Sequence, residues 1–289
     1  PALSTGAPAP GRYERVSDPV AAWDAAHRVW LIASLGLVED DVALLVSRSP
    51  DGVRWSPPIV AAAEDEGSYD KEWLACDNGT VSPYLGRCYL AYLETTSGRI
   101  SVKRSLDGGL TWSAPVSPDS VAALGRFVNG VFPVVRPDGR LVIAATAMNL
   151  FTAFGEDDIG AVASDDGGET FGPGAVLARV SGQEFNGVRA PLLVTADVDA
   201  DGNVYVAWAD CRFRPDCLGS DIVLSRSSDG VAWEGPVRVP VGPLELDEDH
   251  FVPGIAVQPG TAGRSARVAL FYHSWARQAG CVIEVCPGI

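Results

Sequence analysis

One short turn sequence occurs four times in this 289-residue chain, and it constrains the fold more than any other feature. Each copy has the form Ser-x-Asp-Gly and ends in an aromatic residue. The copies, here called the Ser-Asp turns, span residues 49–55, 105–112, 164–171 and 227–233. Their aspartates are 56, 59 and 63 residues apart (51 to 107, 107 to 166, 166 to 229). Self-similarity at a nearly fixed period indicates a repeat architecture.

Each Ser-Asp turn has the chemistry of a β-hairpin end. Asp-Gly supplies the positive φ angles of a tight turn, the carboxylate can accept backbone N–H groups, and the aromatic residue can fold back as a hydrophobic plug. A β-rich run precedes every copy, and two more strands lie further upstream, for example at 188–195 and 204–208. Four strands and about 55 residues per unit match a propeller blade. The sequence therefore predicts an all-β fold, a β-propeller of four-stranded antiparallel blades.

We expect a single propeller domain over residues 1–289 with five visible blades. The predicted blades span roughly 18–60, 70–118, 128–178, 187–240 and 249–289. The last blade lacks a Ser-Asp turn, and propellers often complete such a blade with an N-terminal strand. Because an open ring leaves unpaired strand edges, we expect residues 1–16 to close a five-blade ring.

The pattern Ser-x-Asp-x-Gly-x-Thr-Trp resembles the Asp-box, or bacterial neuraminidase repeat, of the sialidase superfamily over roughly residues 18–250. The resemblance implies motifs on the outer rim of the blades and substrates in a central funnel. Sialidases have six blades, so an incomplete six-bladed ring is the alternative architecture. The superfamily includes sialidases, other glycosidases, lyases, sorting receptors and proteins without known activity, so the fold alone does not give the function.

Charge and hydropathy exclude some classes of partner. The formal net charge of −15 argues against nucleic acid and anionic membrane surfaces, which need a basic footprint. No stretch of 18 or more apolar residues is present, so no membrane span is expected. The first residues contain no signal peptide and are typical of a processed or trimmed start.

The six cysteines form three pairs that are close in sequence. These pairs are Cys76 with Cys88, Cys211 with Cys217, and Cys281 with Cys286. An even count in close pairs predicts three local disulfides in a secreted protein. Zinc binding is an alternative, although no Cys-x-x-Cys pair exists and the histidines are scattered. Six reduced, buried cysteines in a cytosolic protein are the other alternative.

In a propeller, the innermost strands line the central channel, so their first residues surround one mouth of the funnel. Alignment of the repeats places polar or charged residues at this point of the units: Arg15, Asp18, Asp70, Lys71, Glu72, Asn129, Arg189 and His250. We interpret them as the lining of a candidate binding site. Ordinary loop residues that satisfy the strand ends are the alternative.

Two segments of this ring are the densest in functional groups. Residues Asp70 to Trp73 combine two carboxylates, an ammonium group and an aromatic face, which suits general acid–base chemistry and sugar stacking. A mutual salt-bridge network is the competing interpretation. The loop 210–217 would place Arg212 or Arg214 against a substrate carboxylate.

The sialidase resemblance implies three arginines around a substrate carboxylate, a tyrosine nucleophile paired with a glutamate, and an aspartate acid/base. The family's Arg-Ile-Pro sequence is absent. By position in the repeat, Arg189 and Arg212 correspond to two of the arginines and Tyr272 to the nucleophile. Its glutamate partner would be Glu72 or Glu184.

No cofactor is predicted, apart from one weighed calcium motif. Asp197, Asp199 and Asp201 have the spacing of a calcium loop, but Trp208 occupies the position of the closing acid. The alternative is a plain hairpin turn.

Three functions remain open. The first is a secreted glycoside hydrolase acting at the funnel mouth, which predicts converging charged groups and a strongly perturbed carboxyl pKa. The second is a non-catalytic propeller that binds a glycan or another small ligand. The third is a lyase or cyclase, which an apolar central pocket with only one or two acids would favour.

Overall fold

A computed structural model describes residues 11–118, 127–148, 156–181, 190–244 and 248–276. This part of the chain consists of strands and turns, with two short 3₁₀ segments, η1 (Pro215–Cys217) and η2 (Gly263–Ser265). Within these ranges, no helix is long and apolar enough to cross a bilayer.

The strands form five antiparallel sheets that follow one another along the chain. Sheet 1 contains β1 (Arg15–Asp24), β2 (Val29–Val38), β3 (Asp41–Ser49) and β4 (Ile59–Ala62). Sheet 2 contains β5 (Tyr69–Cys76), β6 (Cys88–Glu94) and β7 (Arg99–Ser105), and Val116 bridges to Val102 at its edge. Sheet 3 contains β8 (Phe127–Val135), β9 (Leu141–Met148), β10 (Glu156–Ser164) and β11 (Ala175–Ser181). Sheet 4 contains β12 (Thr195–Val198), β13 (Val204–Asp210), β14 (Asp221–Ser227) and β15 (Val237–Arg238). Sheet 5 contains β16 (Glu248–Val257) and β17 (Val268–Ala276).

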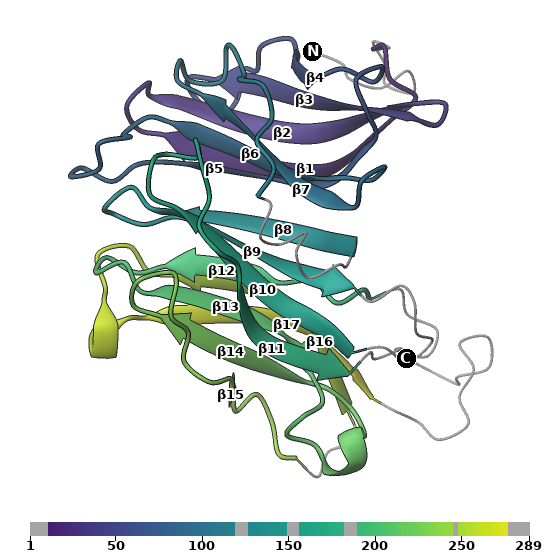
Figure 1. Cartoon of the computed structure of the whole chain (residues 1–289), viewed down its shortest axis with the longest axis vertical. Coiled ribbons are helices and arrows are strands. Elements are labelled where there is room, and N and C mark those ends of the chain that lie inside the picture. The colour runs from purple at the N-terminus through teal and green to yellow at the C-terminus, as the bar shows by residue number, and fades with distance from the viewer. Residues whose placement is uncertain (1–10, 119–126, 149–155, 182–189, 245–247, 277–289) are drawn as a thin grey trace.

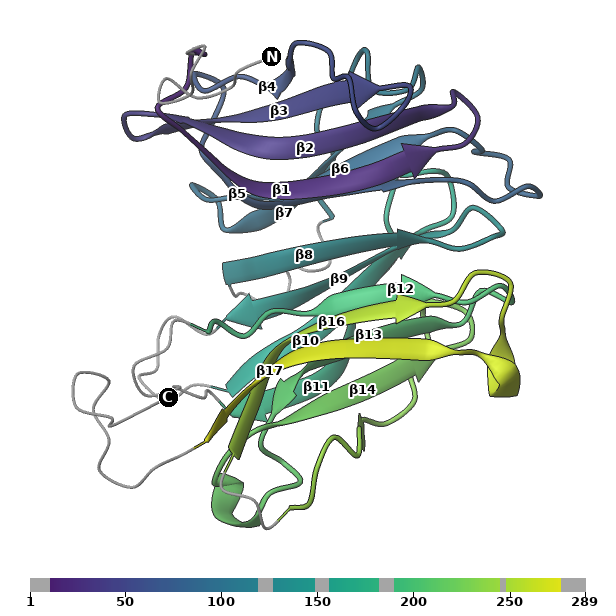
Figure 2. The same ribbon diagram turned by 180° about the vertical axis from the view of Figure 1, so that it is seen from behind.

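The first strand of each sheet packs against the first strand of the next, in the order β1, β5, β8, β12 and β16. Figures 1 and 2 show the sheets as an arc, with sheet 1 at one end and sheets 4 and 5 at the other. The predicted propeller-type fold of antiparallel blades is therefore confirmed, with five sheets in the described part of the chain.

The expected closure of the ring is not observed, because the described sheets form an open arc. The N-terminal segment stays within sheet 1: the Glu14 N–H donates to the Leu37 carbonyl at 2.9 Å, and Arg15 pairs with Leu37 of β2. Backbone groups that pair in sheet 1 are not available to another sheet. Residues 1–10 lie outside the described residues.

Apolar side chains between neighbouring sheets form the core. Middle strands such as β9 and β13 are buried along most or all of their length, because each is covered on both faces. Separate core clusters lie between sheets 1 and 2, sheets 2 and 3, and sheets 3 and 4. Most of β17, in contrast, is exposed.

The four Ser-Asp turns share one hydrogen-bond pattern. In each, the serine hydroxyl donates to the aspartate Oδ1, at 2.8 to 3.1 Å. The same Oδ1 accepts two consecutive backbone N–H groups, and a glycine N–H donates to the serine Oγ. Glycines in these turns have φ between 68° and 82°, as the Asp-Gly sequences predict.

Three of these turns also join their own sheet to the preceding one. Trp112, Phe171 and Trp233 pack against the core clusters between sheets 1 and 2, 2 and 3, and 3 and 4, respectively. All three are partly buried. The aromatic residue of the turn therefore packs at an interface between sheets.

An arginine of the preceding sheet binds each of the same three turns. The Arg48 side chain donates to the Gly108 carbonyl at 2.6 Å, and Arg87 donates to the Gly167 carbonyl at 2.5 Å. Arg140 donates to the Asp229 carbonyl in the same way. These arginine–turn contacts repeat along the arc and fix the spacing of neighbouring sheets.

Two of the three predicted disulfides are present. Cys76 and Cys88 are paired residues of β5 and β6, and their bond joins the two strands. Cys211 and Cys217 close the loop that follows β13. Cys281 and Cys286 lie outside the described residues.

Candidate functional site

The first strands of four sheets carry a β-bulge at equivalent positions. The register shifts between Ser17 and Val20, Asp70 and Trp73, Asn129 and Phe132, and Phe251 and Gly254. Each bulge contains a residue with positive φ: Asp18, Lys71, Gly130 and Val252. Such conformations are costly for residues other than glycine, and bulges often occur beside functional sites, where they redirect side chains.

Two of these bulges bring four of the predicted site residues together. The Lys71 ammonium lies 3.0 Å from Asp18 Oδ2 and 3.6 Å from Asp70 Oδ1. These three side chains are 25%, 30% and 42% exposed, respectively. With Glu72 they form the bulge cluster, which lies where β1 and β5 pack against each other. The cluster thus offers two accessible carboxylates held by one ammonium group.

Glu72 differs from its neighbours because it is 2% exposed. Neither carboxyl oxygen has a hydrogen-bond partner in the described part of the chain. Burial is the largest influence on the pKa of Glu72 and raises it, Asp18 and Asp70 also raise it, and its own backbone N–H and Lys71 oppose them; the resulting pKa is about 9. Glu72 is therefore a neutral, proton-bearing acid at pH 7, beside carboxylates that are more exposed.

Trp73 and Asn129 have surroundings that the sequence did not indicate. The Trp73 ring packs against Phe132, with ring centroids 4.4 Å apart, between sheets 2 and 3. Asn129 pairs with Thr146 of β9, and the buried side-chain oxygens of both lack a hydrogen-bond partner within the described ranges. One face of the aromatic residue assigned to sugar stacking is thus in contact with another ring.

His250 belongs to a separate buried group around Asp221. Asp221 accepts two hydrogen bonds from Arg214, both at 2.9 Å, and is also bound by Arg238. His250 is 2% exposed, and its Nδ1 lies 3.3 Å from Asp221 Oδ1. The pKa of Asp221 lies below its usual range because the hydrogen bonds from the two arginines outweigh the effect of burial. This group ties the loop after β13 to β16.

The two arginines of the 210–217 loop are both bound to aspartates. Arg214 uses its guanidinium on Asp221 and on the Leu244 carbonyl. Arg212 donates to Asp210 at 2.7 Å and to the Arg179 carbonyl at 2.6 Å, and it remains 30% exposed.

The described structure does not bring together the residues that correspond, by position in the repeat, to a sialidase site. Tyr272 lies on β17, where its ring meets that of His250 edge-on, with centroids 5.1 Å apart. In both views, β17 and β5 lie in opposite halves of the arc (Figures 1 and 2). Arg15 is exposed on β1, while Arg189 and Glu184 lie outside the described residues.

Of the three aspartates considered as a calcium loop, Asp197 belongs to β12, and Asp199 and Asp201 lie in the turn between β12 and β13. Asp199 accepts hydrogen bonds at both oxygens, from donors that include Asn203, Tyr205 and the Gly263 N–H. Within the described ranges, no group of three or more His, Cys, Asp or Glu side chains is placed to hold a metal ion.

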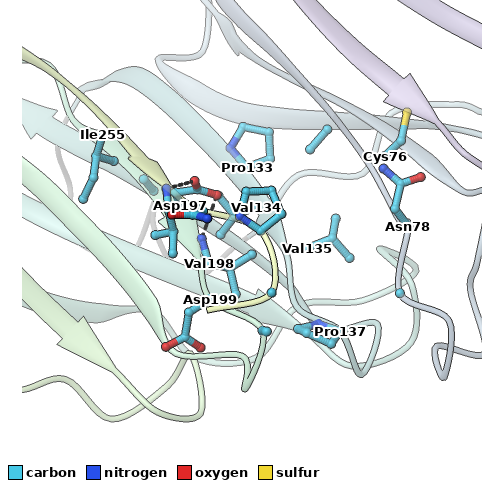
Figure 3. A pocket seen from close by; sticks show the side chains of 18 of the residues that line it. Cys76, Asn78, Pro133, Val134, Val135, Pro137, Asp197, Val198, Asp199 and Ile255 are labelled. Carbon is cyan, nitrogen blue, oxygen red and sulfur yellow. Dashed lines mark hydrogen bonds between the residues drawn. The ribbon is translucent and has the colours of Figure 1, made fainter. Parts of the chain in front are cut away.

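A cavity of about 710 Å³ lies between the inner strands, toward their C-terminal ends. Residues from β5, β8, β12 and β16 and from the turns after them line it (Figure 3). Most of the lining is apolar. Phe132 lines this cavity and packs on Trp73, whereas none of the bulge-cluster residues is part of the lining.

Comparison with solved structures relates this arc to known enzymes. A Dyadobacter fermentans protein of unknown function aligns with a TM-score of 0.60 and 17% identity, over 90% of this chain and 76% of that one. The microbial sialidase Hz136 aligns with a TM-score of 0.55 and 15% identity, over 86% of this chain and 50% of that one. A Penicillium chrysogenum α-L-arabinanase aligns with a TM-score of 0.55 and 15% identity, over 90% of this chain and 78% of that one.

The described sheets share the propeller-type fold of these sialidase and arabinanase structures. At these identities, the likeness concerns the fold alone, and the chain spans about half the length of the sialidase Hz136. No protein-family model and no curated protein sequence matches the chain.

Proposed function

We propose that the chain is a glycoside hydrolase that acts at the bulge cluster. One observation carries the proposal: Lys71 bridges two partly exposed carboxylates, those of Asp18 and Asp70, next to the buried neutral acid Glu72. Hydrolysis of a glycosidic bond uses one protonated carboxyl group and one ionised carboxylate. The fold of the sialidase and arabinanase structures supports the same class of reaction.

The proposed roles follow from charge and exposure. Glu72 holds a proton at neutral pH, but its oxygens are buried, so its side chain must turn out of this position before it can protonate the departing glycosidic oxygen. Asp18 and Asp70 are the carboxylates that a sugar can meet, and one of them activates water or attacks the sugar. Lys71 holds both in place and partly offsets their mutual repulsion.

The charges of the cluster favour a neutral sugar over an anionic one. In the described part of the chain, Lys71 is the cation placed between the two carboxylates, and Arg212 and Arg214 are bound to Asp210 and Asp221. Arg15, on the same strand as Asp18, is exposed. A sugar carboxylate would approach two aspartates in a protein of net charge −15. A neutral pentoside or hexoside is therefore the proposed substrate class, ahead of a sialoside.

We also propose a single propeller domain over residues 1–289 that works in an oxidising, extracellular compartment. The two disulfides support the compartment, because such bonds persist where thiols are oxidised.

A panel of fluorogenic neutral glycosides and a sialoside, assayed between about pH 5 and pH 8, tests the activity. We expect release from a neutral glycoside and a loss of about 10²- to 10⁴-fold in kcat for Asp70→Asn and Glu72→Gln. Asp40→Asn, in the exposed turn between β2 and β3, is the matched control and should keep full activity. Silence of the wild-type protein across the panel would favour a non-catalytic glycan-binding propeller.

A further inference from the structure

The central cavity is distinct from the bulge cluster, because Asp18, Asp70, Lys71 and Glu72 are not among its lining residues. Its wall is formed mainly by alanine, valine, proline and isoleucine. Asp197 of β12 projects among these residues, between Ile255 and Pro133 in the view of Figure 3. Asp197 is partly buried, so it loses part of its contact with water, a cost that a partner can offset. Asp199 also lines the cavity, but Asn203, Tyr205 and the Gly263 N–H already bind its carboxylate.

The protein compensates Asp197 only in part. One carboxylate oxygen accepts the Val198 N–H at 2.8 Å, and the other accepts the Val257 N–H at 2.6 Å. A carboxylate has about four acceptor positions, so each oxygen keeps one that these two backbone groups do not use. Burial raises the pKa of Asp197, and the two hydrogen bonds only partly oppose this effect. A cationic partner would complete the environment of this carboxylate.

The form of the cavity limits what that partner can be. Its volume of about 710 Å³ lies in the range of small-molecule sites. A divalent metal ion prefers several carboxylate or other oxygen ligands, and the described residues contain no group of three or more His, Cys, Asp or Glu side chains placed to hold one. The apolar wall suits a hydrocarbon body, and Asp197 suits a group that donates hydrogen bonds and carries positive charge.

We propose that the central cavity binds a small organic cation, a primary ammonium on a short apolar body, with Asp197 as its anchor. The ammonium donates to the unused acceptor positions of Asp197, and the body contacts Val134, Val135 and Ile255. The competing explanation is structural: the bond from Val257 to Asp197 ties β16 to β12.

Titration of the folded protein with n-butylammonium, and with 1-butanol as the neutral analogue, tests the proposal. We expect saturable binding of one amine, with at least about tenfold weaker binding of the alcohol. Asp197→Asn should weaken amine binding by at least about tenfold. Asp70→Asn, in the bulge cluster, should leave it unchanged, which separates this result from that of the glycosidase assay.

A second readout needs no variant, so it remains informative if Asp197→Asn does not fold. The backbone amides of Val198 and Val257 donate to Asp197. When n-butylammonium is added, the NMR chemical shifts of these two amides should change along the same saturation curve as the heat of binding measured in the titration. Absence of saturable amine binding, or equal affinity for amine and alcohol, would overturn the proposal. Unmoved Val198 and Val257 amides would overturn it as well.

Discussion

At the scale of single residues, Glu72 is the group whose environment departs most from that of an ordinary surface acid. It is buried, its oxygens have no hydrogen-bond partner in the described part of the chain, and its pKa is about 9. A buried acid of this kind costs stability whenever it must ionise. A carboxyl group that keeps its proton next to two other carboxylates is what a proton donor requires.

Activity should distinguish a proton donor from a neutral structural residue. Glutamine has the shape of protonated glutamate and no charge, so Glu72→Gln should keep the fold and lose turnover. We expect the thermal midpoint at pH 6 to be unchanged or higher, while kcat falls by about 10²-fold or more. A Glu72→Gln protein with wild-type kcat would remove Glu72 from the mechanism.

Stability should also depend on pH through Glu72. Between its ordinary pKa of 4.5 and its folded value of about 9, the folded state holds a proton that the unfolded chain has released. The contribution of this group to stability is therefore complete below about pH 4.5 and declines as the pH rises toward about 9. Urea unfolding at several pH values should show a steeper decline for the wild type than for Glu72→Gln. Parallel curves would mean that Glu72 ionises normally.

At the scale of elements, the Ser-Asp turns are the repeated units that fix each hairpin end. Burial alone would raise the pKa of Asp166, but hydrogen bonds from Thr170, Ser164 and Glu169 lower it to about 2. Its stabilising effect is present above the ordinary pKa and is lost as the pH falls through about 2. The ionised side chain therefore helps to hold the turn at neutral pH.

Asp166→Ala should destabilise the protein by about 1–2 kcal/mol at pH 7, because the Glu169 and Thr170 N–H groups lose their acceptor. The turn is partly exposed, so water replaces some of the lost bonding. Asp40→Ala is the control, with an expected change below about 0.5 kcal/mol. Equal unfolding midpoints for the two variants would contradict this account of the turn.

Trp112→Ala tests the packing of a turn on its neighbouring sheet. The indole packs against the core cluster between sheets 1 and 2 and is partly buried. We expect the free energy of unfolding, measured by chemical denaturation, to fall by about 2–4 kcal/mol. This is at or below the loss of about 3–5 kcal/mol that is usual for a fully buried aromatic residue. Phe271→Ala on exposed β17 should cost less than about 1 kcal/mol. A Trp112→Ala cost below that of Phe271→Ala would show that the turn does not contribute to the interface.

At the scale of the whole molecule, sheets meet through the arginine–turn contacts and the clusters beneath them. Arg140 donates to the Asp229 carbonyl of the next sheet and also pairs with Asp165 of its own sheet, whereas Arg54 pairs only with Asp51 among the ion pairs of the described residues. Arg140→Ala should therefore cost about 1–2 kcal/mol, and Arg54→Ala less than about 0.5 kcal/mol. Differential scanning calorimetry of both variants checks the contrast, and similar losses would contradict it.

The sequence predicted the fold well because the periodic signal is local. Asp-Gly turns and the strands before them depend on neighbouring residues, and the described strands form successive antiparallel sheets of the predicted kind. The absence of ring closure could not be predicted from the sequence. Residues 14 and 15 pair with Leu37 of β2 through backbone groups, and such pairing leaves no signal in the sequence.

The candidate site could be predicted only in part, because contacts distant in sequence decide it. Asp18 and Lys71 come together through bulges in which both adopt positive φ, a conformation that neither residue type announces. His250 appeared accessible by its place in the repeat, but Asp221 lies beside it in a buried network. The sequence suggested Asp197 as part of a calcium loop or of a plain turn, and its place in a cavity depends on strands from three other sheets.

The arginine–turn contacts all run in one direction along the chain. The arginine always belongs to the earlier sheet, and the turn it binds belongs to the later one. During synthesis, which proceeds from the N-terminus, each receiving surface is therefore complete before the turn that docks on it leaves the ribosome. The molecule can thus be assembled sheet by sheet as it is translated, with each finished sheet acting as a template for the next.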